Sequence, residues 1–428
     1  MKLTLLIFLI LQSYLYANVQ LIKKENTDSN TTLLVVAGIH GNEPGGYFSA
    51  SILATNYTIT SKNLWIIPNL NSASIVKNRR GIHGDMNRKF AYMKQNDKDK
   101  KIVKEVKNII LSPKVSLVLN LHDGHGFYRK KNQGSIFNPN AWGQTCVIDQ
   151  CNLKIKQPFG SLNEIAIEVA NSVNKKLLKK HHIFDVKNTN TKYDDEAMQL
   201  SLTYFSVTNN KPAFAIETSK NLSSLSEKVF YQLLAIEEYM KIMGIKYTRN
   251  FILNETEIAK ILNNYGTLSI NSNILLNLSD IKKSLSYIPI KSNSNVFKFS
   301  HPLGKVKKRK GKFLVFIGNK QVTSLKPQYF KLADGCQNKL DFVIDGEKFS
   351  FSNTSDFNVT ADFKVIKSKK QRVNIIGYQP KGHIDESNVT ISLNNLNKNY
   401  SVDKHHKVYR VEFYKKEEFC SMVMVHFK

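Results

Sequence analysis

The stretch Leu33–Gly46, LLVVAGIHGNEPGG, constrains the fold of this chain more than any other. Its five leading apolar residues end at Gly38, which predicts a short buried strand followed by a tight turn. His40 and Glu43 come next, three residues apart. On a turn that leaves a buried strand, an imidazole and a carboxylate at this spacing can converge on one cation. A catalytic zinc site also needs a third protein ligand and an open position for water.

Two further strand ends carry side chains that could complete such a site. The apolar run Val115–Leu121 predicts a buried strand, and His122 follows it directly. Ala213–Glu217 predicts another strand, which ends in a carboxylate. Ligands collect at the carboxyl ends of strands in α/β sheets, so we expect His122 and Glu217 to lie beside the first pair. Glu217 could then take a proton from zinc-bound water and pass it to a leaving amine, although a carboxylate at a strand end is commonly a helix cap or a surface group.

A basic loop, RRGIHGDMNR, lies between these strands and holds Arg80 and Arg88 eight residues apart. One guanidinium could stabilise the oxyanion of a tetrahedral intermediate, and the other could clamp a substrate carboxylate in bidentate fashion. For each arginine alone, a solvated basic patch is the ordinary interpretation. Asp123, or a backbone carbonyl, could orient a ligand histidine.

Strands and helices alternate from Leu33 to about Gly244, which predicts an α/β sheet covered by helices on both faces. Leu64–Pro68 predicts a strand within it, and Lys101–Leu111 a helix. Two capping boxes predict the starts of further helices, which run to about Leu178 and Gly244; they are Ser161-x-x-Glu164 and Ser224-x-x-Glu227.

The pattern changes in the second half of the chain. Helical periodicity fades after about Leu262, short apolar segments separated by Asn, Ser and Gly take over, and Asp345-Gly346 predicts a hairpin. We therefore expect two small all-β modules. The predicted domains are a signal peptide at 1–17, a catalytic domain at 18–246, a small β domain at 247–333 and a C-terminal β-sandwich-like domain at 334–428.

The first residues predict export. Met1-Lys2 supplies a positive charge, Leu3–Leu11 is a largely apolar run too short to span a bilayer, and Ala17 suits the position before a cleavage site. A buried N-terminal helix is the alternative. Because no other stretch is long and apolar enough to cross a membrane, we expect a protein that does not span the membrane once the signal is removed.

Four cysteines in an exported chain suit two disulfides. We expect one local bond, Cys146–Cys151, and one between distant positions, Cys336–Cys420, although the sequence allows three connectivities. A zinc–thiolate site is a weaker alternative, because the sequence contains no Cys-x-x-Cys pair.

The chain carries 62 Lys and Arg against 34 Asp and Glu, a formal charge of +28. Such a field attracts nucleic acid, acidic lipid or another anionic polymer. The alternative is a compositional bias spread over the surface. We expect no nucleic-acid partner, because the sequence has neither an arginine-rich run nor zinc-finger spacing.

Taken together, the His-x-x-Glu pair, the Asn-Arg dipeptide, the strand-end His and the strand-end Glu resemble the zinc carboxypeptidases of the carboxypeptidase A class, over roughly residues 33–244. The resemblance implies a carboxypeptidase-like mixed sheet flanked by helices. It also implies one zinc ion held by His40, Glu43 and His122. Glu217 would be the general base and acid, Arg80 would stabilise the oxyanion, and Asn87 with Arg88 would grip the terminal carboxylate of an exopeptidase substrate.

A narrower resemblance rests on the spacing from Arg80 to Arg88, the short gap to His122, the segment LSLTYFSVTNNKPAFAIETS and the two β modules. These features are similar to the periplasmic murein carboxypeptidases that set helical cell shape in certain Gram-negative bacteria. The resemblance implies a DL-carboxypeptidase that removes meso-diaminopimelate from uncrosslinked murein tripeptides and leaves dipeptide. It implies that Trp142 and Thr203 line the diaminopimelate pocket, and that the sacculus is a partner. Some members carry Gln at the first ligand position, where this chain has a histidine.

Two alternatives remain open. GIHGNEPGG, DMNR and NLHD are also similar to the aspartoacylase and succinylglutamate desuccinylase families, which hydrolyse small N-acyl amino acids in the cytoplasm; the signal and the second β module argue against them. The other alternative is a catalytically idle murein-binding scaffold. Loss of activity usually removes a ligand or the base, and all of these residues are present here.

Overall fold

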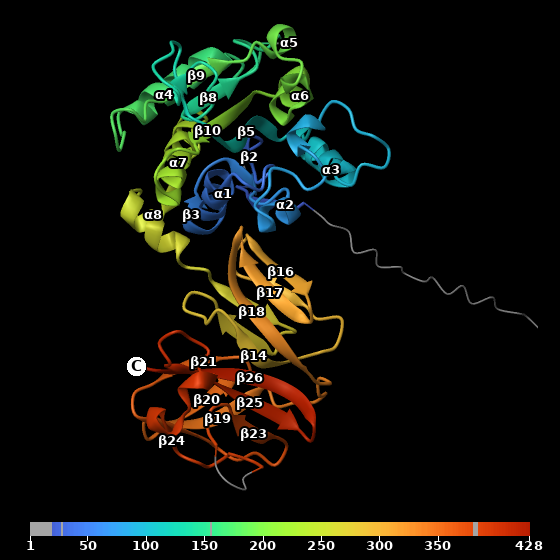
Figure 1. Cartoon of the computed structure of the whole chain (residues 1–428), viewed down its shortest axis with the longest axis vertical. Helices are drawn as coiled ribbons and strands as arrows, with labels where there is room; N and C mark the ends of the chain where they lie inside the picture. Colours follow the sequence, from blue (N-terminus) through green and yellow to red (C-terminus); the bar gives the residue numbers. More distant parts are fainter. Residues whose placement is uncertain (1–18, 27–28, 155, 380–383) are drawn as a thin grey trace, which may run out of the picture.

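The computed structural model describes residues 19–26, 29–154, 156–379 and 384–428, so the signal peptide predicted at 1–17 lies outside the described residues. Three modules are arranged one after another along the long axis of the molecule (Figure 1). An α/β module occupies one end, a small β module lies in the middle, and a second β module that contains the C-terminus occupies the other end. Among the described residues, no helix is both long and apolar enough to cross a membrane.

A mixed sheet forms the centre of the α/β module, with the strand order β1-β4-β2-β5-β10-β8-β9. The four central strands are parallel, whereas β1 and β8 run antiparallel to their neighbours β4 and β10. The central strands are nearly continuous apolar runs, as expected where both faces of a sheet are covered. The strands are β1 (Ile22–Lys24), β2 (Thr32–Ala37), β4 (Asn63–Ile67), β5 (Val115–Gly124), β8 (Thr145–Ile148), β9 (Asp185–Asn188) and β10 (Ala213–Ser219).

Helices cover this sheet on both sides (Figure 1). On one side α7 contacts both α1 and α4, and on the other side α3 and α6 contact the central strands. The helices are α1 (Pro44–Asn56), α2 (Ser72–Val76), α3 (Lys100–Ile110), α4 (Leu162–Asn174), α5 (Thr191–Asp194), α6 (Leu202–Thr208), α7 (Leu225–Ile242) and α8 (Glu255–Leu262). The α/β class, the central strands and the helix at Lys101–Leu111 are thus confirmed.

The two predicted capping boxes have different outcomes. At α7, the Ser224 hydroxyl accepts the N–H of Glu227 at 3.0 Å, and the Glu227 carboxylate accepts the N–H of Ser223 at 2.7 Å. At α4, the helix begins where it was predicted, with Ser161 as the N-cap residue, but the Ser161 side chain makes no capping hydrogen bond, so the predicted capping box is absent. Ser161 has ψ +73°, outside the extended conformation that brings a capping hydroxyl over the first turn. The same helix ends at Asn174, short of the predicted Leu178.

The middle β module packs directly against the α/β module. A Cβ at Gly318 would lie 3.0 Å from the Phe48 ring, and the residue has φ +58°, so glycine suits this close approach. The Asn319 amide also donates to the Asn78 side chain at 3.3 Å. The strands form one sheet of β12 (Thr267–Ile270), β13 (Ile274–Asn277) and β15 (Phe297–Phe299), and another of β14 (Leu285–Ile290), β16 (Gly304–Arg309), β17 (Lys312–Ile317) and β18 (Lys320–Tyr329).

Helix α8 lies beyond the domain boundary predicted after residue 246 and contacts α7 (Figure 1). The short strands β3 (Tyr57–Ile59) and β11 (Tyr247–Arg249) also pair across this boundary. The α/β module therefore contacts the residues beyond 246 through a helix and a strand pair as well as through the chain connection. The predicted domain limits stay predictions.

The C-terminal module has a hydrophobic core of its own. Its two sheets consist of β19 (Lys339–Ile344), β20 (Glu347–Ser352), β22 (Asp362–Val365) and β24 (Ile391–Ser392), and of β21 (Asp356–Val359), β23 (Arg372–Ile375), β25 (Val408–Lys415) and β26 (Glu418–Phe427). Asp345 and Gly346 form the predicted two-residue turn between β19 and β20, both with positive φ.

One of the two expected disulfides is present. Cys336 and Cys420 are bonded and join the start of the C-terminal module to β26. The expected bond between Cys146 and Cys151 is wrong, because both are free cysteines. Cys146 lies inside β8 and is buried, whereas Cys151 is exposed in the segment after that strand. The two thiols therefore lie in different environments despite their closeness in sequence.

Candidate metal centre and active site

Three buried side chains converge at the carboxyl ends of β2 and β5. His40 follows β2, Glu43 is the N-cap residue of α1, and His122 lies in β5. The Nδ1 atom of His40 lies 3.0 Å from one carboxylate oxygen of Glu43, and the Nδ1 atom of His122 lies 2.8 Å from the other. The candidate ligand atoms of the three residues all lie within 4.8 Å of one another. The structure thus brings together the three residues predicted as metal ligands.

The chemistry of these donors fits a metal ion. The other ring nitrogen of His40, Nε2, is hydrogen-bonded to Asp85 at 2.8 Å, which fixes the orientation of the ring. Nδ1 of His40 is buried and makes no hydrogen bond, although it points at a carboxylate oxygen. Two imidazole nitrogens and one carboxylate with a neighbouring cavity are a donor set that suits a catalytic zinc ion.

His40, Glu43 and His122 shift one another's pKa values because they are buried side by side. Burial acts to raise the pKa of Glu43, but the two histidines outweigh it and hold that pKa well below its ordinary value. Burial also acts to lower the pKa of His40, but Glu43 and Asp85 outweigh it and raise the pKa. Burial lowers the pKa of His122. The carboxylate is therefore ionised and available to a cation.

Asp85 orients more of this site than the sequence indicated. Its carboxylate accepts from the Nε of Arg80 at 2.8 Å as well as from His40, and it accepts the backbone N–H of Asn87 at 2.9 Å. Burial acts to raise its pKa, but His40 and Arg80 outweigh burial and lower it. Asp123, which we expected to orient a histidine, instead accepts the N–H of Gly45 at 2.8 Å and so holds the start of α1.

Asn87 and Arg88, which are predicted to grip the terminal carboxylate of the substrate, lie in one short turn. Asp85 caps the 3₁₀ helix η1 (Met86–Arg88). The side-chain oxygen of Asn87 accepts the N–H of Leu202 at 3.0 Å, so its NH₂ group is the end left for a ligand. Arg80 is about half exposed, and its Nη1 lies 3.3 Å from Glu43. The two arginines and Asn87 thus reach the same space from a loop that Asp85 holds in place.

Glu217 lies beside a candidate metal ligand, His122, on the neighbouring strand. It pairs with His122 in the parallel register of β10 and β5, so both side chains leave the sheet on the same face. Burial, and then the negative charges of Glu43 and Asp123, raise the pKa of Glu217 well above its ordinary value, although Lys220 and Arg80 oppose the shift. A carboxyl group with a raised pKa next to a metal-ligand cluster is suited to accept and return a proton.

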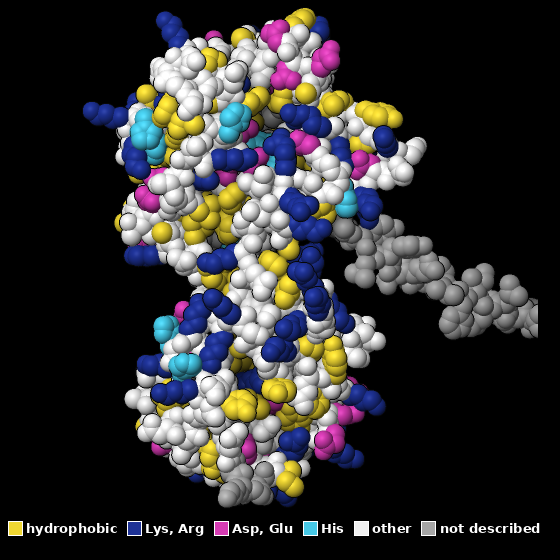
Figure 2. Space-filling view, in the orientation of Figure 1, with side chains coloured by type: hydrophobic (Ala, Val, Ile, Leu, Met, Phe, Trp, Pro, Cys, Tyr) yellow, Lys and Arg dark blue, Asp and Glu magenta, His cyan; other side chains and the backbone are white. Residues whose placement is uncertain are grey.

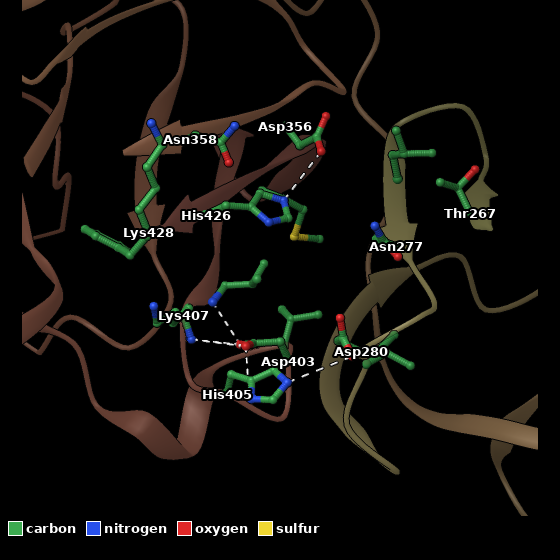
Figure 3. Close-up of a pocket in the computed structure, with 16 residues that line it drawn as sticks. Thr267, Asn277, Asp280, Asp356, Asn358, Asp403, His405, Lys407, His426 and Lys428 are labelled. Carbon is green, nitrogen blue, oxygen red and sulfur yellow. Dashed lines mark hydrogen bonds and ion pairs between the residues drawn. The ribbon is translucent and has the colours of Figure 1, made fainter. Parts of the chain in front are cut away.

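One cavity of about 260 Å³ collects all the predicted site residues. Its lining includes His40, Glu43, Arg80, Asn87, Arg88, His122, Trp142, Thr203 and Glu217. A larger cavity, of about 610 Å³, lies between the two β modules and is lined by His–Asp pairs such as His426 and Asp356, 3.5 Å apart (Figure 3). Because the candidate metal ligands line only the smaller cavity, that one is the candidate active site.

Two polar lining residues, Asn120 and Lys220, were not predicted from the sequence. Both polar atoms of the Asn120 amide are buried without a partner, so the amide is available to a ligand. The Lys220 ammonium lies 3.4 Å from Glu43 and adds a third cation to the walls. His125 also lines the cavity. The one available signal was the polar Asn120 inside the apolar run VSLVLNL.

Two family models of known proteins match separate parts of the chain, one at each end. Residues 1–263 match the family model described as the catalytic part of carboxypeptidases controlling helical cell shape. Residues 333–428 match the C-terminal domain of metallo-carboxypeptidases. No match is found among curated protein sequences.

Solved structures of the cell shape determinant protein Csd4 from Helicobacter pylori resemble the whole chain. The apo structure is 31% identical with a TM-score of 0.90, and the match covers 96% of this chain and 100% of that chain. The mDAP-bound form, described as a D,L-carboxypeptidase, is 31% identical with a TM-score of 0.90 over 95% of this chain and 100% of that chain. The tripeptide-bound form has a TM-score of 0.89 and 31% identity, and covers 96% and 100%.

Proposed function

Because this chain belongs to the family of carboxypeptidases that control helical cell shape, we propose that it is a periplasmic, zinc-dependent murein D,L-carboxypeptidase. Its substrate is the uncrosslinked tripeptide stem, and it hydrolyses the amide between the γ-carboxyl of D-glutamate and meso-diaminopimelate. The products are the dipeptide stem and free diaminopimelate. The observation that carries this proposal is the cavity in which the candidate metal ligands, Glu217 and the arginine pair meet.

His40, Glu43 and His122 would hold the zinc ion. When bound, zinc would lower the pKa of a water molecule and polarise the scissile carbonyl. Asp85 keeps the ring of His40 in the orientation that points Nδ1 at the site.

The remaining chemistry belongs to side chains of the cavity. Glu217 takes a proton from the attacking water and returns it to the diaminopimelate nitrogen as the amide C–N bond breaks. Arg80, fixed by Asp85, donates to the oxyanion that develops on the carbonyl oxygen. Arg88 and the NH₂ group of Asn87 bind the carboxylate of the terminal residue, which limits cleavage to the chain end.

The lining supports an anionic substrate with a free terminal residue. Arg80, Arg88 and Lys220 put three cations on the walls, and Trp142 and Thr203 lie among the other lining residues. Forms of Csd4 with mDAP and with a tripeptide bound show that a related protein of the same fold takes this class of ligand. The disulfide between Cys336 and Cys420 supports an oxidising compartment, in agreement with the predicted export signal.

Mass spectrometry of muropeptides tests the proposal directly. Purified sacculi are incubated with the zinc-loaded protein and with its Glu217→Ala variant. We expect loss of tripeptide with a matching gain of dipeptide in the first sample alone, while the variant still binds zinc. Unchanged muropeptides with the zinc-loaded protein would refute the proposed substrate, and full activity of the variant would refute the role of Glu217.

A further inference from the structure

The positive charge of this chain is segregated. Residues 281–333 contain thirteen Lys and Arg and no Asp or Glu. The segment between Glu43 and Asp85 also lacks any acidic residue. The first of these segments forms most of the middle β module, and the second leads into the loop that carries Arg80. These two parts of the chain together hold seventeen basic and no acidic residues, so they contribute much of the net charge of +28.

The strongest concentration lies on the hairpin of β16 and β17. Lys305, Lys307 and Arg309 alternate along β16, so they share one face of the strand, and all three are exposed. Lys312 on β17 pairs with Arg309 in the register. Side chains on one face of a strand are about 6.6 Å apart, so the hairpin presents a row of cations at that spacing. β16 is the edge strand of its sheet, which leaves the row open on one side.

This row continues toward the active-site cavity. Lys305 and Val76 line the same small hollow at the junction of the modules, and Lys77 follows Val76 in the chain. The carbonyl oxygen of Arg79 accepts the N–H of Gly41 at 3.0 Å, directly after His40. We call this set of exposed cations the basic track; its members are Lys77, Arg79, Lys305, Lys307, Lys308, Arg309, Lys310 and Lys312.

Lys and Arg side chains gather along this junction on the visible face of the molecule (Figure 2). Among the residues that the structure describes, no member of the basic track forms an ion pair. Arg80, by contrast, is engaged by Glu43 and Asp85. The charge of the track is therefore not neutralised within the protein and is available to an anionic partner.

We propose that the basic track binds the carboxylate-bearing stem peptides of murein that neighbour the stem held in the active-site cavity. This inference rests on the proposed function, and it assigns the surface by which the enzyme holds the polymer. Each uncrosslinked tripeptide stem presents carboxylates on D-glutamate and diaminopimelate, so a murein strand is a repeating anion. A murein strand that lies along the track can place one of its stem peptides in the active-site cavity, where the amide bond to diaminopimelate is hydrolysed. A nucleic acid or an anionic bilayer would meet the same charge but offers the cavity no such bond.

Lysines on an edge strand have another known effect, because they prevent one edge from pairing with another. The charge-reversed variant Lys305→Glu, Lys307→Glu, Arg309→Glu separates the two roles. It keeps the edge charged and therefore protected, but it reverses the sign of the row. Its matched control is Lys339→Glu, Lys348→Glu, Lys369→Glu, which makes the same change of net charge at exposed positions of the C-terminal module.

The experiment measures co-sedimentation with purified sacculi and hydrolysis of two substrates, soluble tripeptide and intact sacculi. Binding is measured in the Glu217→Ala background, so that the substrate is not consumed. We expect the track variant to bind sacculi about tenfold more weakly, because each contact that it loses is an exposed ion pair, which is weak in water. Its kcat/KM on sacculi should fall in parallel, while kcat/KM on soluble tripeptide and the behaviour of the control variant stay unchanged.

Two results would overturn the proposal. One is unchanged binding and turnover of sacculi by the track variant. The other is loss of binding to phosphatidylglycerol vesicles or to duplex DNA while binding to sacculi is retained, which would assign the track to that partner instead. If the unaltered protein binds sacculi through the track but leaves soluble tripeptide intact, the proposed reaction fails and the binding surface stands.

Discussion

The carboxylate of Asp85 meets a predicted metal ligand, the predicted oxyanion arginine and the turn that carries Asn87. Replacing Asp85 by Asn removes the charge with little change of size. We expect metal affinity to fall about 10- to 100-fold, because a partner that orients a ligand histidine typically contributes that much. Chelator competition on the purified protein measures the change.

A matched control for this variant is Asp97→Asn. Asp97 also belongs to a charged network, with Lys89 at 2.9 Å, but it contacts none of the three predicted metal ligands. Equal metal affinity of the Asp85 and Asp97 variants would show that Asp85 does not position the site.

Substitutions of Arg88 and of Arg80 should affect different steady-state constants. Arg88→Ala should mainly raise KM for the tripeptide, by roughly ten- to a hundredfold, because it removes a charge-assisted hydrogen bond made to bound substrate. Arg80→Ala should lower kcat instead, because its contact with the carbonyl oxygen strengthens as charge develops. If Arg88→Ala lowered kcat and left KM unchanged, the assigned roles would have to be exchanged.

At the residue scale, the sequence predicted the candidate metal ligands and the candidate general base, but it did not predict Asp85, which orients one of them. His40, Glu43, His122 and Glu217 could be found because each lies in the last residues of a strand with a clear apolar pattern or in the turn that follows it. The carboxyl ends of parallel strands meet on one edge of the sheet. The contacts of Asp85 depend on how a loop folds back on another strand, which no local pattern encodes.

At the scale of elements, the caps of α4 and α7 offer a paired test. Ser224→Ala should destabilise the protein by about 1 kcal/mol, because the hydroxyl satisfies the N–H of Glu227 and also contacts Glu255 of α8. Ser161→Ala should change stability by much less, because its hydroxyl caps nothing. Chemical denaturation of both variants measures the difference, and equal losses would contradict the assignment of these caps.

The same two helices show which features of a helix end a local sequence motif can predict. The Ser-x-x-Glu motif occurs at both positions, but only Ser224 has the extended backbone, ψ +161°, that lets it cap. The side chain of Asn174, the last residue of α4, exchanges two hydrogen bonds with the backbone of Phe184, at 2.8 and 2.9 Å. That contact ties the end of the helix to a later segment, so the helix end could not be predicted from its own residues.

At the scale of the whole molecule, the disulfide should stabilise one module. The bond closes a loop of 84 residues, so the double variant Cys336→Ser, Cys420→Ser should cost the C-terminal module about 2–4 kcal/mol. Hydrolysis of soluble tripeptide should persist below its melting temperature, because neither cysteine lines the active-site cavity. Thermal unfolding with Cys151→Ser as control measures this, and an unchanged melting profile would contradict it.

The order of the modules was predictable because periodicity and composition change along the chain. How the modules join was not. Nothing in residues 247–333 indicated that their apolar side chains continue the interior of the α/β module, because burial at a junction depends on both partners.

That continuity bears on how such proteins change over evolutionary time. Buried residues of β2, such as Leu34, and of β18, such as Leu325, belong to one uninterrupted apolar cluster. The C-terminal module adds only a few residues, such as Met422 of β26, to that cluster and has most of its apolar residues in a second one. A recombination event that parted the first two modules would expose apolar surface on both fragments. The C-terminal module could be exchanged for another with less loss of stability. We therefore expect the first two modules to be inherited together, and relatives to differ most in the C-terminal module.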